Sequence, residues 1–335
     1  MSQLNVLVTA GSRRVALVDA FRRALAASGG GRVVVTDVNA LSPAVYRADR
    51  AYRVPISSDP SYLDEVFAIA LAEGVRLVVP TIDDELTLFA HAANRFAAAG
   101  VRVAVSPPTT TQICNDKYAT CVTLRAHGIP AAISYLPPDI PVAPLFPLFI
   151  KPRYGRGSVG AHIVRDAHEL AFFLDYVDMP VVQQFLPGAE FTIDVLCDFQ
   201  GRPLSIVPRE RVVIRSGVID RGRTVKDDGL IALGESVTAA LPCVGAVNVQ
   251  CRMVDGRPVV FEINPRFSGG IPLTIQAGAD FPAMLVELVL GRRVTPRIGH
   301  FRDQLWMTSY EASLFLDESQ VRLDALRQAG IGEVA

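Results

Sequence analysis

The segment FEINPRF, at 261–267, aligns polar side chains along one face of an expected strand. With the two-residue period of a strand, Glu262, Asn264 and Arg266 share one face. The opposite face carries the apolar residues Phe261, Ile263 and Phe267. A carboxylate and an amide oxygen suit Mg²⁺ held between a protein and substrate phosphates, and a fixed guanidinium stabilises developing negative charge. The segment predicts phosphate chemistry assisted by a divalent cation; the alternative is a solvated edge strand.

Gln250 lies on the preceding expected strand, at 246–254, and is a candidate third ligand. If the hairpin loop comprises the three residues 255–257, Gln250 faces Glu262 directly. If the loop has two residues, Gln250 falls on the wrong face, because a one-residue change of register reverses every side chain. Both alternatives stay open at the level of sequence.

The hexapeptide GRGSVG matches the letters of a dinucleotide-binding loop, but its position is different. Its members are Gly155, Arg156, Gly157, Ser158, Val159 and Gly160. It joins the expected strands 147–152 and 161–165 instead of opening a helix, so we expect a hairpin flap. Such a flap can offer backbone N–H groups to nucleotide phosphates, and Lys151 and Arg153 just before it favour this interpretation. An ordinary β-hairpin with a loose turn is the alternative.

Lysine is rare in this chain. Of 33 basic residues only Lys117, Lys151 and Lys226 are lysines. Because arginine serves elsewhere, a lysine that is present is a candidate for a compact ammonium contact with phosphate, with chance as the alternative.

A cationic cluster begins within the expected strand 204–214 and continues beyond it. Its members are Arg209, Arg211, Arg215, Arg221, Arg223 and Lys226. We expect a loop that holds phosphates or a substrate carboxylate through bidentate contacts, with Arg211 and Lys226 as the favoured pair. A solvated loop is the alternative of equal weight.

The first hundred residues alternate apolar runs with amphipathic stretches. Strands are expected at 4–10, 32–38, 77–83 and 101–106, separated by helices. This alternation predicts an α/β, doubly wound parallel sheet. The turn after the first strand has only Gly11 of the dinucleotide fingerprint, and Asp37 resembles its ribose-binding acid. We interpret this turn as structural.

The rest of the chain changes pattern. A helix is expected at 115–128, with Asn115 or Asp116 as its N-cap. Short strands joined by turns then dominate, with helices expected at 166–176, 228–240 and 279–290, which indicates an α+β region. After residue 300 a strand-like run and a short helix are expected.

Composition excludes several classes of protein. The 335 residues are 50% hydrophobic with a formal net charge of −1, which argues against disorder and against nucleic-acid binding. No apolar run reaches the ~20 residues of a membrane span, and the N-terminus lacks a signal-peptide pattern. Five cysteines without a CxxC pair indicate neither a disulfide framework nor a zinc site. We expect a cytoplasmic protein that binds neither nucleic acid nor membrane.

Together these motifs resemble the ATP-grasp superfamily, in particular its carbamoyl phosphate synthase large-subunit-like and biotin-carboxylase-like branch. The matching segments are NDK, IKPRYGRGSVG, QQFLPGAEFTIDV, NVQ and FEINPRFSGG. The resemblance implies a Rossmann-like pre-ATP-grasp domain at 1–107, a two-lobed α+β ATP-grasp domain at 108–300 and a C-terminal extension at 301–335. The small lobe would comprise about 108–182 and the large lobe about 183–300.

The resemblance also implies roles for single residues. Lys117 and Lys151 would contact ATP phosphates under the flap, and Glu190 would bind the ribose hydroxyls. The adenine pocket would be lined by Gln183, Gln184, Phe185 and Leu186. Two Mg²⁺ ions (or Mn²⁺) would be bound by Gln250, Glu262 and Asn264, and Arg266 would contact the transferring phosphate. The substrate carboxylate would be held by Arg215, Ser268, Gly269 and Gly270.

The expected activity is that of an ATP-dependent carboxylate–amine ligase that forms an acyl phosphate and releases ADP and phosphate. Its partners would be a small-molecule carboxylate and an amine. A carbamate- or carboxyphosphate-forming kinase is the second candidate; the single grasp unit of this chain, where the full synthase subunit carries two, argues against carbamoyl phosphate synthesis proper. An NAD-dependent oxidoreductase and a nucleotide-binding module without catalysis are the further alternatives.

Overall fold

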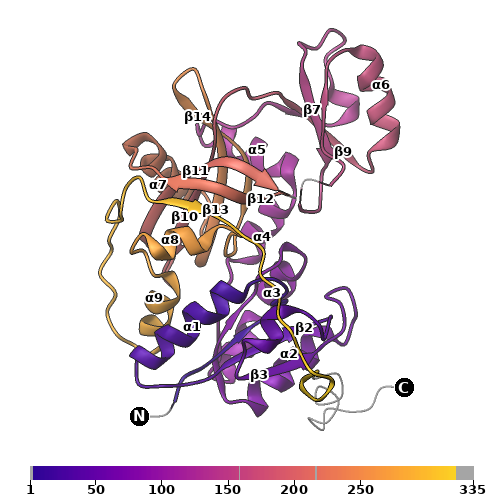
Figure 1. The fold of residues 1–335 in the computed structure, drawn as a ribbon. Coiled ribbons are helices and arrows are strands. Elements are labelled where there is room, and N and C mark those ends of the chain that lie inside the picture. Colours follow the sequence, from indigo (N-terminus) through magenta and orange to yellow (C-terminus); the bar gives the residue numbers. More distant parts are fainter. Residues whose placement is uncertain (1–2, 158, 216, 322–335) are drawn as a thin grey trace.

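The computed structural model describes residues 3–157, 159–215 and 217–321, whose strands form three sheets (Figure 1). The first sheet is parallel, with strand order β3-β2-β1-β4-β5. Its strands are β1 (Asn5–Val8), β2 (Val33–Asp37), β3 (Arg50–Arg53), β4 (Val75–Val79) and β5 (Arg102–Val103). The segments between them are α1 (Val15–Ala27), η1 (Pro43–Tyr46), α2 (Tyr62–Ala72) and α3 (Asp83–Ala98).

Helices cover both faces of this sheet. Val6 and Val8 point to a core shared with α1, whereas Leu7 between them points to a core with α2 and α3. Both faces of β1 are buried, as expected for a strand in a doubly wound sheet. Two helices from late in the chain, α8 (Ile271–Gln276) and α9 (Phe281–Val289), pack on the α1 side. The parallel sheet confirms the predicted α/β class of the N-terminal region.

The small lobe, expected at about 108–182, is a four-stranded antiparallel sheet between Ser134 and Gln184 with order β6-β9-β7-β8. Its elements are β6 (Ser134–Tyr135), η2 (Pro137–Asp139), β7 (Leu148–Pro152), β8 (His162–Val164), α6 (Ala167–Tyr176) and β9 (Pro180–Gln184). It projects from the rest of the molecule at the upper right of Figure 1. The flap at 155–160 connects β7 to β8 in this lobe, so its expected hairpin position is confirmed.

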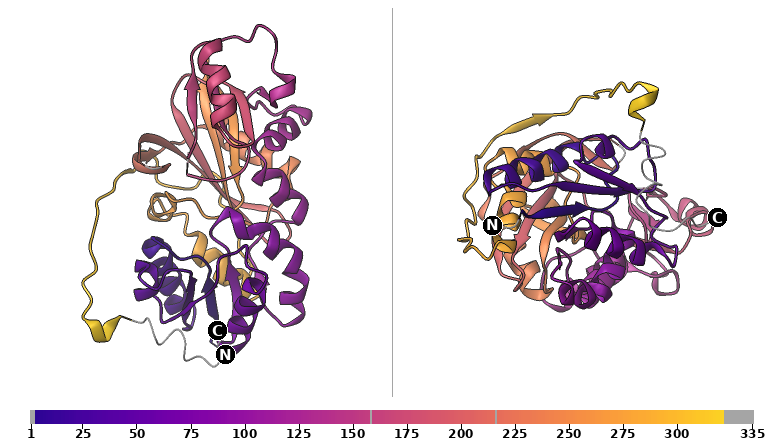
Figure 2. Two further views of the ribbon diagram at one scale, coloured as in Figure 1. Left: turned by 90° about the vertical axis from the view of Figure 1, so that its right-hand side faces the viewer. Right: turned by 90° about the horizontal axis from the view of Figure 1, so that it is seen from below.

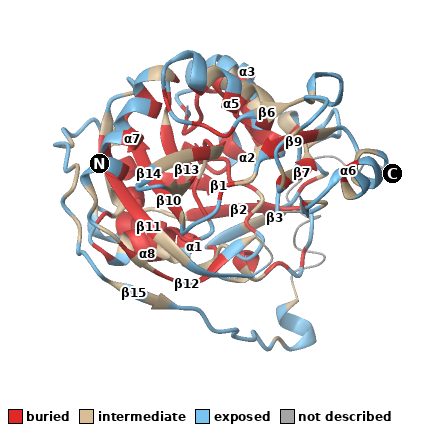
Figure 3. Ribbon diagram, turned by 90° about the horizontal axis from the view of Figure 1, so that it is seen from above, coloured by how far each residue is buried: buried red, intermediate tan, exposed pale blue. Residues whose placement is uncertain are grey.

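The large lobe is a six-stranded antiparallel sheet with order β14-β13-β10-β11-β12-β15. Its strands are β10 (Glu190–Cys197), β11 (Pro203–Arg215), β12 (Val218–Thr224), β13 (Gly245–Val254), β14 (Arg257–Asn264) and β15 (Trp306–Thr308). Residues of α4 (Pro108–Asn115), α5 (Lys117–Ala126) and α7 (Asp228–Ala240) join one hydrophobic core with this sheet. Figure 3 shows buried residues concentrated in the strands of the sheets.

One expectation about local structure is confirmed and one is wrong. The helix expected at 115–128 is α5, and a separate helix that the pattern did not predict, α4, ends just before Asp116. Asp116 caps α5 as predicted, since its side chain accepts bonds from the backbone N–H groups of Tyr118 and Ala119. The expected strand 204–214 is β11, but the residues after it, expected as a loop, form its hairpin partner β12, which begins with the β-branched Val218 and Ile219 that favour strand.

The C-terminal segment runs along the outside of the molecule (Figure 2). It leaves α9, adds β15 to the edge of β12, and then forms the short η3 (Glu318–Gln320). The extension therefore contains the expected strand, and its remaining residues, 322–335, lie outside the described residues. No helix among the residues described is both long and apolar enough to cross a bilayer.

Candidate active site

A cavity of about 400 Å³ lies between the two lobes, and we term it the lobe cavity. Its walls come from α5, β7, β9, β10 and the hairpins β11–β12 and β13–β14. Of the residues singled out from the sequence, it brings together Lys117, Lys151, Gly155, Arg156, Gly157, Gln183, Gln184, Phe185, Leu186, Glu190, Arg211, Gln250, Glu262 and Arg266. Segments more than a hundred residues apart thus converge on one space.

Both candidate lysines of the lobe cavity are buried. The Nζ atom of Lys151 lies 3.8 Å from Glu262 Oε2 and donates to the Phe261 carbonyl at 3.4 Å. Lys117 Nζ donates to the Gly155 carbonyl at 2.6 Å, at the start of the flap. Burial lowers the pKa of Lys117, although Glu262 opposes this shift. Two ammonium groups in one buried space favour an anionic ligand such as a phosphate chain.

Asp116 connects the two elements that carry the lysines. In addition to capping α5, its carboxylate accepts from Arg153, whose Nη2 lies 2.6 Å from Oδ2. Burial raises the pKa of Asp116, but the bonds from Arg153 and the N–H of Ala119 outweigh it, so the net pKa is lowered. Since Lys117 begins α5 and Arg153 follows β7, this one carboxylate fixes the helix and the strand that carry the lysines. The sequence identified Asp116 only as a cap.

A β-bulge decides the position of Gln250. Val254 pairs with Arg257, so the β13–β14 loop has two residues, the case that was expected to exclude Gln250. Beyond Cys251, however, the register shifts by one residue at Phe261, and Gln250 pairs with Glu262. Neither expected alternative is fully right. The loop has two residues, yet the bulge restores the pairing of Gln250 with Glu262 that a two-residue loop alone would remove. Phe261, expected on the opposite face, lines the lobe cavity together with Glu262.

One face of the β13–β14 hairpin carries side-chain oxygens of the kind that ligate metal ions. Glu262 Oε1 accepts from Asn264 Nδ2 at 3.1 Å, and Asn248 pairs with Asn264 across the strands. Asn248 Oδ1 is buried and has no hydrogen-bond partner among the described residues. Sequence reasoning missed Asn248, although the motif NVQ contains it.

One carboxylate with neighbouring amide oxygens fits Mg²⁺ whose remaining ligands are phosphate oxygens and water. Within 3–157, 159–215 and 217–321, no group of three or more His, Cys, Asp or Glu could hold a metal by protein ligands alone. The residues present therefore fit a cation that binds together with a nucleotide. Gln250, Glu262 and Asn264 would hold it.

Arg266 joins the lobe cavity to the N-terminal region. It follows β14, lines the cavity and pairs with Asp83 at the start of α3, with Nη2 2.8 Å from Oδ2. This ion pair holds the guanidinium in place, in agreement with the fixed cation expected from the sequence.

The opposite end of the cavity contains the expected adenine-side residues. Gln183 is buried, and its Nε2 donates to Ser134 Oγ at 2.9 Å. Glu190, expected to bind ribose hydroxyls, accepts from Arg211 Nη1 and Arg252 Nη2, each at 2.7 Å. Arg211 was expected to hold phosphate or substrate carboxylate; in this structure it is committed to Glu190 and to the Gly217 carbonyl.

Two glycine turns meet over the lobe cavity. An added Cβ at Gly217, the hairpin turn between β11 and β12, would lie 3.0 Å from the backbone of Gly157 in the flap. Gly217 has a φ of 75°, which a side chain would strain. Arg156 of the flap pairs with Asp84 at the start of α3, with 3.1 Å between Nη2 and Oδ2. Gly160 does not line the cavity, and Ser158 lies outside the described residues.

A second space of about 760 Å³, termed the junction cavity, lies between the N-terminal region and the large lobe. Arg215, Ser268 and Gly269, expected to hold a substrate carboxylate, line it, and Arg156 lines both cavities. Gly270 does not; an added Cβ there would lie 2.3 Å from the buried Arg209 Nη1, so its role is close packing.

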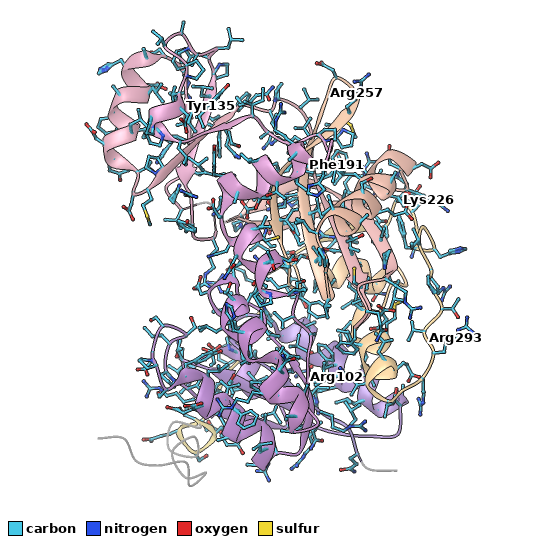
Figure 4. The ribbon with its side chains drawn as sticks, turned by 180° about the vertical axis from the view of Figure 1, so that it is seen from behind. Arg102, Tyr135, Phe191, Lys226, Arg257 and Arg293 are labelled. Atoms are coloured by element: carbon cyan, nitrogen blue, oxygen red, sulfur yellow. The ribbon has the colours of Figure 1, made fainter. Side chains whose placement is uncertain are left out.

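Lys226 is not brought to either cavity. Its side chain is exposed at the end of β12, and Figure 4 shows it at the outer side of the molecule, the side that also carries Arg293. The expected pairing of Lys226 with Arg211 is wrong, because β12 runs antiparallel to β11 and carries the chain away from the hairpin turn.

Two family models match the chain. Residues 6–104 match a model described as the PylC-like N-terminal domain, and residues 177–312 match one described as ATP-grasp in the biosynthetic pathway with Ter operon. Carbamoyl phosphate synthase large chains are similar: that of Thermus thermophilus is 27% identical over 276 residues, covering 75% of this chain and 26% of that protein. That of Mycobacterium bovis is 28% identical over 265 residues, covering 69% and 23%. The chain thus spans about a quarter of the length of these relatives.

Solved structures share the fold. The biotin carboxylase domain of Hydrogenobacter thermophilus 2-oxoglutarate carboxylase, in complex with MgADP, ADP and bicarbonate, has a TM-score of 0.70 at 16% identity, covering 91% of this chain and 74% of that one. The L-amino acid ligase of Bacillus licheniformis has a TM-score of 0.67 at 20% identity, covering 90% and 78%. These matches confirm the resemblance found in the sequence. Residues 177–312 of this chain are therefore similar to the ATP-grasp family and residues 6–104 to the PylC-like N-terminal domain, and the chain shares the fold of ATP-grasp enzymes.

Proposed function

We propose that this protein is an ATP- and Mg²⁺-dependent carboxylate–amine ligase. The observation that carries the proposal is the convergence of buried Lys117 and Lys151 on Glu262 beneath the flap. Two ammonium groups beside one carboxylate leave a net positive charge that phosphates would balance. The adjacent carboxylate and amide oxygens suit Mg²⁺ bound together with those phosphates.

In this proposal a carboxylate oxygen of the substrate attacks the γ-phosphorus of ATP, the bond to the β–γ bridging oxygen breaks, and ADP leaves. An amine nitrogen then attacks the acyl carbon of the acyl phosphate, the acyl C–O bond breaks, and phosphate leaves as the nitrogen releases its proton to water. Such transfers depend on positioning and charge neutralisation. Lys117, Lys151 and Arg266 supply fixed positive charge, and no protein nucleophile is required.

Mg²⁺, when bound with the nucleotide, would neutralise phosphate charge beside Glu262, Asn264 and Gln250. The protein's own part is to hold these oxygens on one face, which the bulge at Phe261 achieves. The pair between Arg266 and Asp83 keeps the guanidinium at the wall of the same cavity.

The experiment that tests the proposal uses hydroxylamine as a general amine. Hydroxylamine converts an acyl phosphate into a hydroxamate, so a panel of carboxylates with MgATP should give hydroxamate and ADP in equal amounts. MgATP at ~100 times its Kd should also raise the unfolding free energy by roughly 2.7 kcal/mol. Absence of both effects would overturn the proposal.

A carboxyphosphate-forming reaction is the second candidate, favoured by the similarity to carbamoyl phosphate synthase large chains. ADP release that depends on bicarbonate and yields no hydroxamate would identify it. The nicotinamide alternative has little support in the structure. Both carboxylate oxygens of Asp37 accept backbone N–H bonds, from Ser12 at 2.6 Å and Asn39 at 2.8 Å, so this acid stabilises the turn.

A further inference from the structure

The junction cavity lies at a place where parallel sheets bind ligands. The sheet order β3-β2-β1-β4-β5 reverses direction between β1 and β4, and the segments that follow β1, β2, β3 and β4 all line the cavity. Ligands of open α/β sheets bind outside the carboxyl ends of the strands at such a switch point. β12 and the turn at 268–272 form the opposite wall.

Part of the junction cavity is apolar yet exposed. Val38 after β2, Ile56 after β3 and Val218 at the start of β12 line it and are 46%, 60% and 47% exposed. Apolar side chains gathered in a concave space, and not buried by the protein's own packing, favour an apolar ligand. The cavity volume of about 760 Å³ is within the 300–1,000 Å³ range of sites for ligands much larger than a free amino acid.

The charged residues of the junction cavity favour an anion. Four arginines line it against two acids, Asp37 and Asp84. The arginines are Arg13, Arg14, Arg156 and Arg215. Asp37 is committed to backbone N–H groups and Asp84 to Arg156, while Arg215 pairs with Glu311 and Arg14 donates to two backbone carbonyls. Within the described part of the chain, the exposed Arg13 guanidinium has no hydrogen bond or ion pair, so it is available to a ligand.

The two cavities share a wall. Arg156 of the flap lines both, and its ion pair with Asp84 places it where the N-terminal region meets the lobes. A molecule in the junction cavity can therefore present a carboxylate toward the lobe cavity while its body lies along the N-terminal loops.

We propose that the junction cavity binds the carboxylate substrate of the ligase and that this substrate is an amphipathic acid larger than a free amino acid. Its apolar body lies against Val38, Ile56 and Val218, and the arginines select its negative charge. The assignment of this ligand as substrate rests on the proposed function.

Straight-chain monocarboxylates from acetate to octanoate are suitable probes, measured by titration calorimetry on the full chain. We expect affinity to increase roughly fourfold for each buried methylene, and octanoate to bind at least tenfold tighter than octylamine. The same acids are then measured as substrates, by MgATP-dependent ADP release with hydroxylamine.

Matched variants locate the binding. Ile56→Glu should weaken octanoate at least tenfold, whereas Leu71→Glu, at a 49% exposed position on α2 outside the cavity, should not. Arg13→Gln should weaken octanoate and leave octanol unchanged, whereas Arg23→Gln on the exposed side of α1 should change neither. MgATP stabilisation verifies that each variant is folded and that the lobe cavity is intact.

Equal affinity for acetate and octanoate, or octanoate binding that Ile56→Glu does not weaken, would overturn the amphipathic ligand. Chain-length-dependent binding without carboxylate-dependent ADP release would overturn its role as a substrate. Absence of both MgATP stabilisation and hydroxamate formation in the wild type would instead contradict the proposed function, a result that the carboxylate titrations do not depend on.

Discussion

The lobe cavity and the junction cavity are built by different means. In the lobe cavity, the charged side chains of strands and of α5 contact one another: Lys151 faces Glu262, and Glu190 lies between Arg211 and Arg252. In the junction cavity, loops at the ends of parallel strands present exposed apolar residues and an arginine without a partner in the described residues. The charged side chains of the lobe cavity are already held in position by one another. The junction cavity leaves apolar side chains and an arginine available for contacts with a ligand.

The difference indicates that the two cavities have different roles. Preorganised charge suits a step in which negative charge develops at fixed positions. A loop-lined apolar cavity can change its specificity without disturbing those charges, because loops tolerate substitution better than paired strands.

The largest expected effect is a loss of activity without a loss of carboxylate binding, which would separate the roles of the two cavities. Lys151→Ala should lower carboxylate-dependent ADP release about 1,000-fold, because it removes a fixed cation from the lobe cavity. Octanoate binding in the junction cavity should be unchanged. Lys226→Ala is the matched control, since this exposed lysine lines neither cavity. An active Lys151→Ala enzyme would contradict the assignment of the lobe cavity.

The next effect concerns a buried ion pair that supports Ser268 in the wall of the junction cavity. Arg209 is 1% exposed, and its Nε donates to Asp194 at 2.7 Å while Nη2 donates to Ser268 in the junction cavity. Asp194→Ala should lower the unfolding free energy by about 3–5 kcal/mol, because it leaves a buried guanidinium unpaired.

Asp64→Ala is the control for this variant, since the Asp64–Arg95 pair is solvent-exposed. It should cost less than about 1 kcal/mol in urea-induced unfolding. Similar losses in the two variants would show that the buried pair gives the wall no special stability.

A smaller effect tests the contact between the flap and the β11–β12 turn over the lobe cavity. Gly217→Ala should raise the KM for ATP about tenfold, a change of 1.4 kcal/mol, because its Cβ would press on Gly157. Gly256→Ala has the same φ of 75° in another hairpin but meets nothing within 4 Å. Equal kinetics in the two variants would mean that the hairpin turn and the flap are independent.

The smallest effect is a pH dependence. The pKa of Asp116 is lowered in the folded protein, so its stabilisation is present above the unfolded value of about 3.9 and is lost as pH falls through the folded pKa. Asp116→Asn should lower the unfolding free energy by about 1–2 kcal/mol at pH 7, and this difference should shrink below pH 4. Urea unfolding at pH 7 and pH 3 measures it, with Asp166→Asn, the cap of α6, as control. A difference independent of pH would contradict this role of the Asp116 carboxylate.

Much of the lobe cavity could be predicted from single segments. The strand period placed Glu262 and Asn264 on one face, and the flap was recognised because two strand patterns enclose its glycines. The Gln250–Glu262 pairing could not be predicted, since it depends on a bulge that the hairpin pattern does not encode. The second half of the arginine-rich segment was misassigned as a loop because charge was weighed above Val218 and Ile219, which begin β12.

The sequence by itself determined the alternation of strands and helices, the polar face of β14 and the lysine-plus-flap pattern, because each depends on neighbours within a few residues. Only the tertiary structure decided that Arg211 pairs with Glu190, that Lys226 lies apart, and that Arg156 lines both cavities. These outcomes depend on the register of antiparallel strands and on how the lobes pack against the parallel sheet. Both are set by contacts between residues far apart in the chain, which local periodicity does not specify.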